Sequence, residues 1–146
     1  MPKVQADGLP LPQRYGAILT IVIGISMAVL DGAIANVALP TIATDLHATP
    51  ASSIWVVNAY QIAIVISLLS FSFLGDMFGY RRIYKCGLVV FLLSSLFCAL
   101  SDSLQMLTLA RVIQGFGGAA LMSVNTALIR LIYPQRFLGR GMGINS

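Results

Sequence analysis

The chain has 146 residues, of which 58% are hydrophobic and only 10% charged, and its mean hydropathy is +0.87. Soluble domains carry roughly 25% charged residues, so this composition excludes an ordinary soluble domain and indicates a membrane protein. The formal net charge of +4 does not indicate nucleic-acid binding, because the basic residues form no solvated face. No cofactor is implied, and because His47 is the one histidine we expect no metal site.

Four apolar runs are long enough to cross about 30 Å of hydrocarbon as α-helices. We expect these helices at residues 15–39, 54–75, 83–101 and 104–132, after a tail at 1–14. A further Gly-containing helix begins at 140–146, so the chain looks cut at this end. The expected fold class is all-α: a polytopic membrane protein with four spans and the start of a fifth, forming one transmembrane fragment.

Local signals mark where the expected helices begin and end. Pro40 should end the first helix, because its ring removes a backbone donor and clashes with the preceding turn. Ser52 or Ser53 should cap the second helix. Gly79 and the basic run at 81–85 should separate the second helix from the third.

The basic residues of the connecting segments fall on one side of this topology. That side carries Lys3, Arg14, Arg81, Arg82, Lys85, Arg130, Arg136 and Arg140. Short segments rich in Lys and Arg stay in the cytoplasm. We therefore expect a multi-pass protein of the bacterial plasma (inner) membrane, with its amino terminus in the cytoplasm and Asp45 and Asp102 outside.

Arg111 lies in a stretch that carries no other charge from residue 103 to 129. Inserting an arginine near the middle of a span costs roughly 2.5–3.5 kcal/mol, while each large apolar residue returns only about 0.3–0.6 kcal/mol. An ionisable residue in this position must face protein or water rather than acyl chains. Arg111 is therefore a candidate functional residue.

Several polar residues share a depth with Arg111. Asp31 lies about 13 Å below the external end of the first helix, and Arg111 and Gln114 lie about 10 and 15 Å below that of the fourth. Asn58 and Gln61 lie about 6 and 10 Å along the second helix. We expect these five side chains to line one wet cavity for protons and substrate, because facing lipid separately would cost more.

The sequence allows two roles for Asp31. It can be only the ion-pair partner that lets Arg111 insert, or it can be a carboxylate that takes up and releases a proton. Burial favours the protonated form of a carboxyl group and a nearby cation favours the ionised form, so hydration or cargo can change its proton occupancy.

Small residues follow Arg111 along the fourth helix. They are Gly115, Gly117, Gly118 and Ala119. Small side chains let another membrane helix approach closely, so we expect these residues to form helix-packing contacts.

Three segments resemble motifs of the major facilitator superfamily. Residues 107–120 read LTLARVIQGFGGAA and are similar to its fourth-helix motif R-x-x-q-G-x-g-a-a, which begins here at Arg111. Residues 72–82 read SFLGDMFGYRR and are similar to the loop motif G-x-L-A-D-R-x-G-R-K, although Met77 and Tyr80 replace two basic residues. Residues 30–40, LDGAIANVALP, and 55–60, WVVNAY, resemble the drug–proton antiporter branch with fourteen spans.

The resemblance implies rocker-type transport, with the first and fourth helices lining a central cavity. It also implies that the loop motif, with Asp76, Gly79, Arg81 and Arg82, latches the two halves on the cytoplasmic side. The implied partners are the lipid bilayer, small-molecule substrate and protons, and the remaining spans. Transporter sites lie between repeats, so we expect four helices alone not to transport.

The leading functional hypothesis is a proton-coupled exporter of hydrophobic or cationic compounds. A facilitator or importer of a small polar or anionic solute is the alternative, with Arg111 binding the anionic group. A self-contained four-helix protein working as an oligomer is a third reading. An enzyme is not expected, because the sequence offers no pairing of nucleophile and base.

Overall fold

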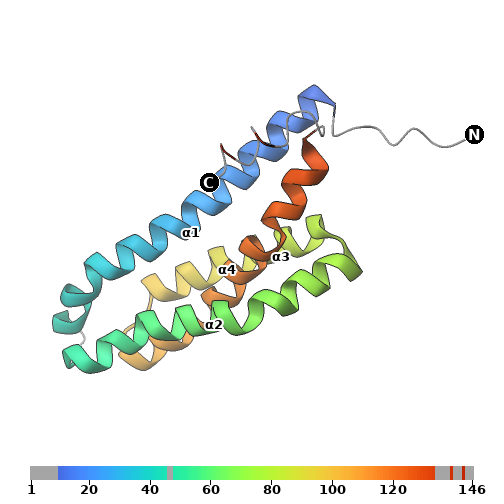
Figure 1. Cartoon of the computed structure of the whole chain (residues 1–146). Coiled ribbons are helices and arrows are strands. Elements are labelled where there is room, and N and C mark those ends of the chain that lie inside the picture. The colour runs from blue at the N-terminus through green and yellow to red at the C-terminus, as the bar shows by residue number, and fades with distance from the viewer. Residues whose placement is uncertain (1–9, 46–47, 134–138, 140–142, 144–146) are drawn as a thin grey trace, which may run out of the picture.

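The computed structural model describes residues 10–45, 48–133, 139 and 143 (Figure 1). Within these ranges the chain forms four helices and no strand: α1 Leu11–Asp45, α2 Pro50–Phe78, α3 Tyr80–Ala99 and α4 Leu104–Ile132. All four are long and apolar enough to cross a membrane. The predicted all-α fold with four spans is therefore confirmed. The expected fifth span at 140–146, apart from Gly143, and His47 lie outside the described residues.

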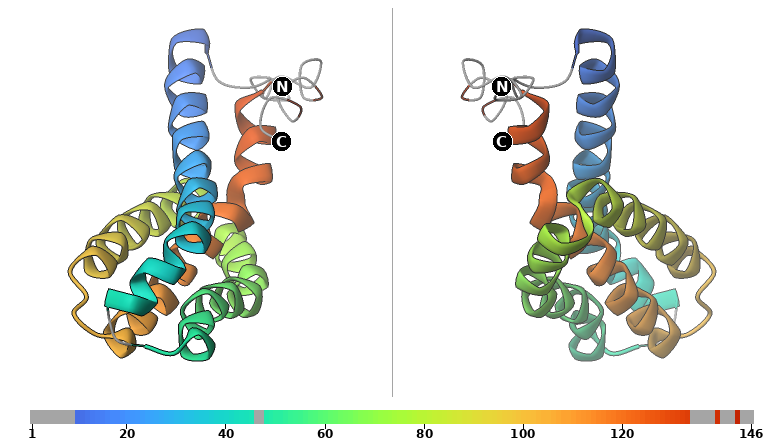
Figure 2. Two further views of the ribbon diagram at one scale, coloured as in Figure 1. Left: turned by 90° about the vertical axis from the view of Figure 1, so that its left-hand side faces the viewer. Right: turned by 90° about the vertical axis from the view of Figure 1, so that its right-hand side faces the viewer.

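The helices run back and forth between two ends of an elongated bundle (Figures 1 and 2). One end gathers the start of α1, the α2–α3 junction and the end of α4, and the other gathers the α1–α2 and α3–α4 connections. We call the first the basic end, because these segments contain Arg14, Arg81, Arg82, Lys85 and Arg130. Asp45 and Asp102 belong to the opposite end.

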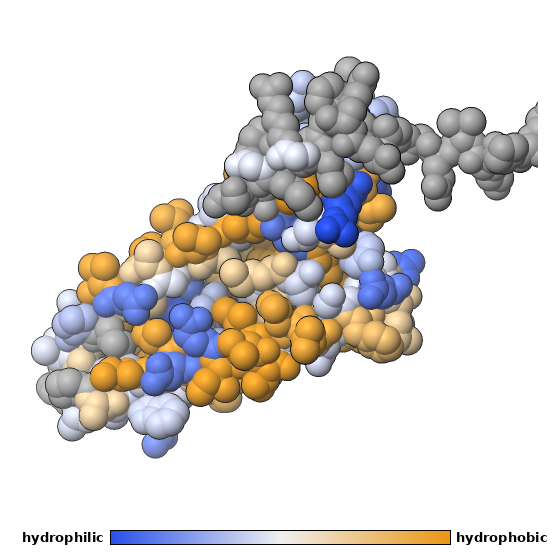
Figure 3. Space-filling view, in the orientation of Figure 1, coloured by the Kyte–Doolittle hydropathy of each residue, from blue (hydrophilic) through white to orange (hydrophobic). Residues whose placement is uncertain are grey.

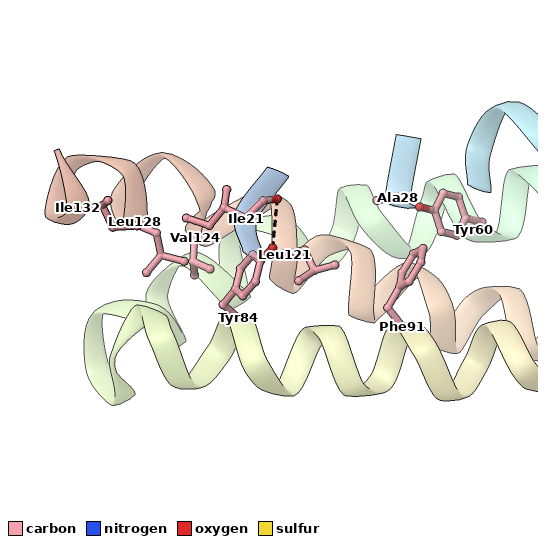
Figure 4. Packing of buried hydrophobic residues seen from close by; sticks show 9 residues of the cluster. All are labelled: Ile21, Ala28, Tyr60, Tyr84, Phe91, Leu121, Val124, Leu128 and Ile132. Atoms are coloured by element: carbon pink, nitrogen blue, oxygen red, sulfur yellow. Dashed lines mark hydrogen bonds between the residues drawn. The ribbon is translucent and has the colours of Figure 1, made fainter. Parts of the chain in front are cut away.

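Helix α4 is the centre of the bundle. It packs extensively along both α2 and α3, whereas α1 makes fewer contacts with its neighbours. Leu121 and Val124 on α4 are completely buried. Figure 4 shows the apolar cluster around them, which also contains Ile21, Ala28, Tyr60, Tyr84, Phe91, Leu128 and Ile132. Tyr84 ties α3 to α1 by donating its hydroxyl to the carbonyl oxygens of Thr20 and Ile21, at 3.1 and 3.3 Å.

Two of the α4 glycines face α2. A Cβ atom at Gly115 would lie 2.7 Å from both the Ala63 Cβ and the Tyr60 carbonyl oxygen. A Cβ at Gly118 would lie 3.2 Å from the Tyr60 hydroxyl oxygen. These glycines therefore allow the backbone of α2 to approach α4, in agreement with close packing of membrane helices through small residues.

A different face of α4 meets α3. A Cβ at Gly117 would lie 2.7 Å from the Phe91 nitrogen and 3.0 Å from the Gly87 carbonyl oxygen. On the facing helix, a Cβ at Gly87 would lie 2.7 Å from the Ala120 Cβ. We call these four residues the α3 seam. The sequence predicted one set of helix-packing contacts for the α4 glycines, but in the structure these glycines contact two different helices, α2 and α3. Ala119, also on α4, is fully buried.

The first helix does not end at Pro40. Helix α1 begins at Leu11 rather than at 15 and continues through Pro40 to Asp45. A proline costs one backbone hydrogen bond, and membrane helices tolerate this loss where neighbouring groups compensate. Beyond Pro40 the helix is held by the burial of Ala43, and the Thr44 hydroxyl donates to the Thr41 carbonyl oxygen. The expected tail at 1–14 is therefore helical from Leu11, and residues 1–9 lie outside the described part.

Two other expected boundaries were also wrong. Helix α2 begins at Pro50, and its cap is Thr49 rather than Ser52 or Ser53, since the Thr49 hydroxyl accepts from the Ser52 backbone nitrogen. Proline suits the first helical position because no backbone donor is needed there. Gly79 alone separates α2 from α3, so the basic residues lie in the first turns of α3.

The outer surface of the bundle is largely apolar. Figure 3 shows broad areas of hydrophobic side chains along the helices, with hydrophilic side chains between them and toward the ends. Val37 and Leu69 are each 81% exposed. Such a surface suits contact with acyl chains or with further membrane helices rather than with water.

Candidate functional site

A buried cluster of polar side chains joins three helices within the apolar bundle. Asp31 comes from α1, Ser95 from α3, and Arg111 and Gln114 from α4. The Arg111 Nη1 donates to the Asp31 Oδ2 at 2.5 Å and to the Gln114 Oε1 at 2.8 Å. The predicted pairing of carboxylate and guanidinium is thus present in the structure, with Gln114 bridging them. We call these four residues the polar cluster.

Gln114 holds the polar cluster together. Its Nε2 donates to the Asp31 Oδ1 at 2.9 Å and to the Ser95 Oγ at 2.7 Å. Its Oε1 also accepts from the Cys98 Sγ at 3.7 Å. The side chain is completely buried, and both its donors and its acceptor are used, so its position fixes the distance between α1, α3 and α4.

The guanidinium of Arg111 is more deeply buried than its partner carboxylate. The exposed fraction of the side chain is 10% for Arg111 and 22% for Asp31. The Arg111 Cζ lies 5.6 Å from the centroid of the Tyr60 ring, close enough for a cation–π interaction. The Arg111 Nε is buried and has no hydrogen-bond partner among the described residues. One strong donor in the cluster therefore remains open to an acceptor.

The local sequence explains how α4 presents this cluster. Arg111 and Gln114 are three residues apart and lie on the same helical face. Gly115 and Gly118 then bring α2 close enough for Tyr60 to reach the guanidinium. The glycines thus pack helices and also enclose the charge, which reduces its contact with lipid.

Asn58 and Gln61 do not join the polar cluster. Both are exposed, and neither is hydrogen-bonded to Asp31, Arg111 or Gln114 in the described part of the chain. The reason is their angular position, because α2 turns about 100° per residue. Asn58 lies on the face opposite Tyr60, and Gln61 lies a quarter turn away from it.

Three residues in or beside the polar cluster, Ser95, Tyr60 and Cys98, were not predicted from the sequence. In the helices expected from the sequence, Ser95 lies about 9 Å from the end at residue 101, and Tyr60 lies about 9 Å from the start at residue 54, close to the expected depth of Arg111. The depth comparison would have found both had it included hydroxyl groups. Cys98, whose thiol donates to Gln114, has no hydroxyl group and lies nearer the helix end, so that comparison would still have missed it. Asn125 was missed as well: its Oδ1 is buried without a hydrogen-bond partner among the described residues.

The residues of the predicted loop motif lie together at the basic end. Gly79 has φ 94°, a conformation that glycine adopts without strain, and it allows α2 to turn directly into α3. Asp76, Arg81 and Arg82 are exposed. The Asp76 Oδ1 accepts a hydrogen bond from the Tyr80 hydroxyl. Tyr80, which stands where the motif has a basic residue, therefore binds the aspartate through an uncharged hydroxyl donor instead of a cation.

Metal coordination is not supported by the described residues. Across 10–45, 48–133, 139 and 143, no three His, Cys, Asp or Glu side chains lie close enough together to hold an ion. The polar cluster instead combines one carboxylate, one guanidinium, an amide and a hydroxyl. Such a set can exchange a proton and recognise a charged group.

Four apolar helices around a buried ion pair define a polytopic α-helical membrane protein with a polar site inside the bilayer. The family model of the Major Facilitator Superfamily matches residues 21–146. The chain belongs to this family, and the family predicted from the sequence motifs is therefore confirmed.

Three proteins of known name are similar to this chain. The riboflavin transporter RibZ of Clostridioides difficile is 34% identical over 92% of this chain and 29% of its own length. The tetracenomycin C resistance and export protein of Streptomyces glaucescens is 34% identical over 94% of this chain and 25% of its own. MdtD of Salmonella paratyphi B, named as a candidate multidrug resistance protein, is 39% identical over 79% of this chain and 24% of its own. The chain thus spans less than a third of each relative.

Proposed function

We propose that the chain forms the amino-terminal helices of a proton-coupled transporter that exports hydrophobic or cationic compounds. The observation that carries this proposal is the buried pair of Asp31 and Arg111, joined by Gln114 at the meeting point of three helices. A charge pair in this position costs stability that apolar side chains of similar size would not cost, and this cost favours a functional role for the pair. The similarity to relatives named for drug export and multidrug resistance supports the same direction.

The proposed coupling depends on the charge of Asp31. When the carboxylate is ionised, it accepts hydrogen bonds from Arg111 and Gln114 and holds α1 against α4. Protonation removes the negative charge and one acceptor, so α1 is released from α4. A lipophilic cation competes with the proton for the same carboxylate. Opposing flow of protons then drives the cation outward.

The charges of the bundle support our proposals for the orientation and the substrate class. Arg14, Arg81, Arg82, Lys85 and Arg130 lie at one end, which we propose faces the bacterial cytoplasm. The carboxylate lies within an apolar bundle, which favours compounds with an apolar body and a positive group.

The test uses the full-length protein in everted membrane vesicles, whose cytoplasmic face is outside, with an acidic interior and a fluorescent lipophilic cation in the outer medium. An imposed pH gradient should drive transport of the dye by the wild type. Asp31→Asn keeps the shape of the side chain but cannot exchange a proton, so gradient-driven transport should fall to the level of vesicles without the protein. The matched control is Asp102→Asn, because Asp102 is exposed between α3 and α4.

Two results would count against export by proton exchange. One is dye transport by Asp31→Asn at the wild-type rate. The other is an equal loss in Asp102→Asn, which would show that any acidic residue has the same effect.

A second candidate function is the uptake or facilitated passage of a small polar or anionic solute. The unpartnered Arg111 Nε favours it, because a guanidinium with a free donor can bind a carboxylate or phosphate. The similarity to a protein named as a riboflavin transporter is compatible with it. Counterflow of an anionic solute that does not respond to an imposed pH gradient would favour this function over proton-coupled export.

A further inference from the structure

A cavity at the basic end is separate from the polar cluster. It has a volume of about 260 Å³ and lies where α1, α3 and α4 meet. Arg81 and Lys85 from the start of α3 line one side. The other walls include Ala17 and Ile21 of α1 and Leu128 and Ile132 of α4. The cavity therefore combines two cations with an apolar wall.

Among the described residues, no acidic side chain forms an ion pair with Arg81 or Lys85. Arg81 and Lys85 are four residues apart on one face of α3, a spacing at which like charges repel. The first turn of α3 contains no acidic residue, and no carboxylate among the described residues lines the cavity. The nearby Asp76 accepts its hydrogen bond from Tyr80 instead. An anion bound in the cavity would relieve this repulsion.

The shape of the lining points to an amphipathic anion. Figure 4 shows Ile21, Tyr84, Leu128 and Ile132 at one end of the apolar cluster, and all four line the cavity. The Tyr84 hydroxyl already donates to α1, so this ring presents mainly apolar surface. A soluble anion would use the cations but not this wall, whereas a phospholipid would use both.

We propose that this cavity binds an anionic phospholipid, with its phosphodiester between Arg81 and Lys85 and an acyl chain against Leu128 and Ile132. The position suits such a ligand, because the cations lie in the first two turns of a membrane helix, beside apolar residues of α1 and of the last turns of α4. Basic pockets between membrane helices recognise anionic headgroups by this chemistry.

The test measures lipid binding to the purified full-length protein in neutral detergent by native mass spectrometry. Phosphatidylglycerol should bind about tenfold more tightly than phosphatidylcholine, since only its headgroup carries a net negative charge. Arg81→Gln combined with Lys85→Gln should reduce phosphatidylglycerol binding about tenfold or more. The control with the same change in net charge is Arg82→Gln combined with Arg130→Gln, because both residues are exposed at this end and neither lines the cavity.

A second variant keeps the charges and fills the space. Ala17→Leu should reduce binding of phosphatidylglycerol while leaving both cations in place. The proposal is overturned if the two double variants bind equally, or if phosphatidylcholine binds as well as phosphatidylglycerol. It is also overturned if inorganic phosphate displaces the lipid at equal concentration, which would identify a site for free anions. Absence of any selective lipid binding also overturns it, and would favour occupation of the cavity by further helices of the full-length protein.

Discussion

The polar cluster and the α3 seam lie on neighbouring stretches of α4 but have opposite chemistry. In the polar cluster, Arg111 and Gln114 hold Asp31 and Ser95 through hydrogen bonds that span three helices. In the α3 seam, Gly117 and Gly87 have no side chains, and this allows α3 to pack closely against α4. A packing contact is satisfied by shape alone, whereas the cluster requires charges that are costly in a membrane. Function is therefore expected in the cluster and stability in the seam.

The largest expected effect is on the ion pair. Asp31→Asn or Arg111→Gln should each lower the free energy of unfolding by about 3 kcal/mol, because each leaves one buried charge unpaired. The double variant should recover much of this loss, since no unpaired charge remains. Unfolding in detergent followed by circular dichroism gives the three values for a double-mutant cycle.

Transport should separate from stability in that cycle. The double variant should remain inactive although its fold recovers, because no group is left to carry the proton. A double variant that transports at the wild-type rate would assign the pair to insertion and packing only.

The next effect compares a glycine of the α3 seam with a glycine on α1. Replacing each by alanine should change the free energy of unfolding in opposite directions. Gly117→Ala should lower the free energy of unfolding by about 2 kcal/mol, because the new methyl group would lie 2.7 Å from the Phe91 backbone nitrogen. Gly32→Ala on α1 meets no atom within 4 Å and should raise it by about 0.5–1 kcal/mol through helix propensity. Thermal unfolding of both variants measures the difference, and equal shifts would mean that the seam is not tightly packed.

The sequence predicted the depth of the polar residues within the helices better than the direction in which their side chains point. Asp31, Arg111 and Gln114 could be grouped because a rise of 1.5 Å per residue sets depth from the helix ends. Asn58 and Gln61 share that depth. However, the direction of a side chain depends on how its helix packs, and α2 packs on α4 through Tyr60 and Ala63. Depth alone therefore does not predict which side chains of α2 face α4.

Helix boundaries show a second limit of sequence reasoning. A proline signals an interrupted hydrogen bond, but the chain beyond it decides whether the helix continues. Pro40 is followed by Ala43, which is buried and keeps α1 helical to Asp45. The Gly79 turn was predictable, because its positive φ needs glycine. The extension of α3 back to Tyr80 was not, because the basic residues there indicated a connecting segment.

A smaller effect is expected where α1 is tied to α3. Tyr84→Phe removes the hydroxyl that donates to Thr20 and Ile21, and should lower the free energy of unfolding by about 1 kcal/mol. The control is Tyr15→Phe, since Tyr15 is 68% exposed and should change stability little. A loss of the same size in both variants, measured by thermal unfolding, would remove this role from Tyr84.

The smallest effect is expected at the edge of the polar cluster. Ser95→Ala removes one of the two acceptors of Gln114 and should lower the free energy of unfolding by about 0.6 kcal/mol, as for other hydrogen bonds between membrane helices. Ser101→Ala is the control, because its hydroxyl donates only within its own segment, to the Phe97 carbonyl oxygen. Transport should remain in both variants; its complete loss in Ser95→Ala would place Ser95 beside Asp31 in proton exchange.

The most direct test of proton exchange at Asp31 is the release of protons when a lipophilic cation is added to the purified full-length protein in weakly buffered solution. If the carboxylate exchanges a proton for the cation, the wild type releases protons and Asp31→Asn releases none. Equal release by the two proteins would contradict the proposed role of the polar cluster.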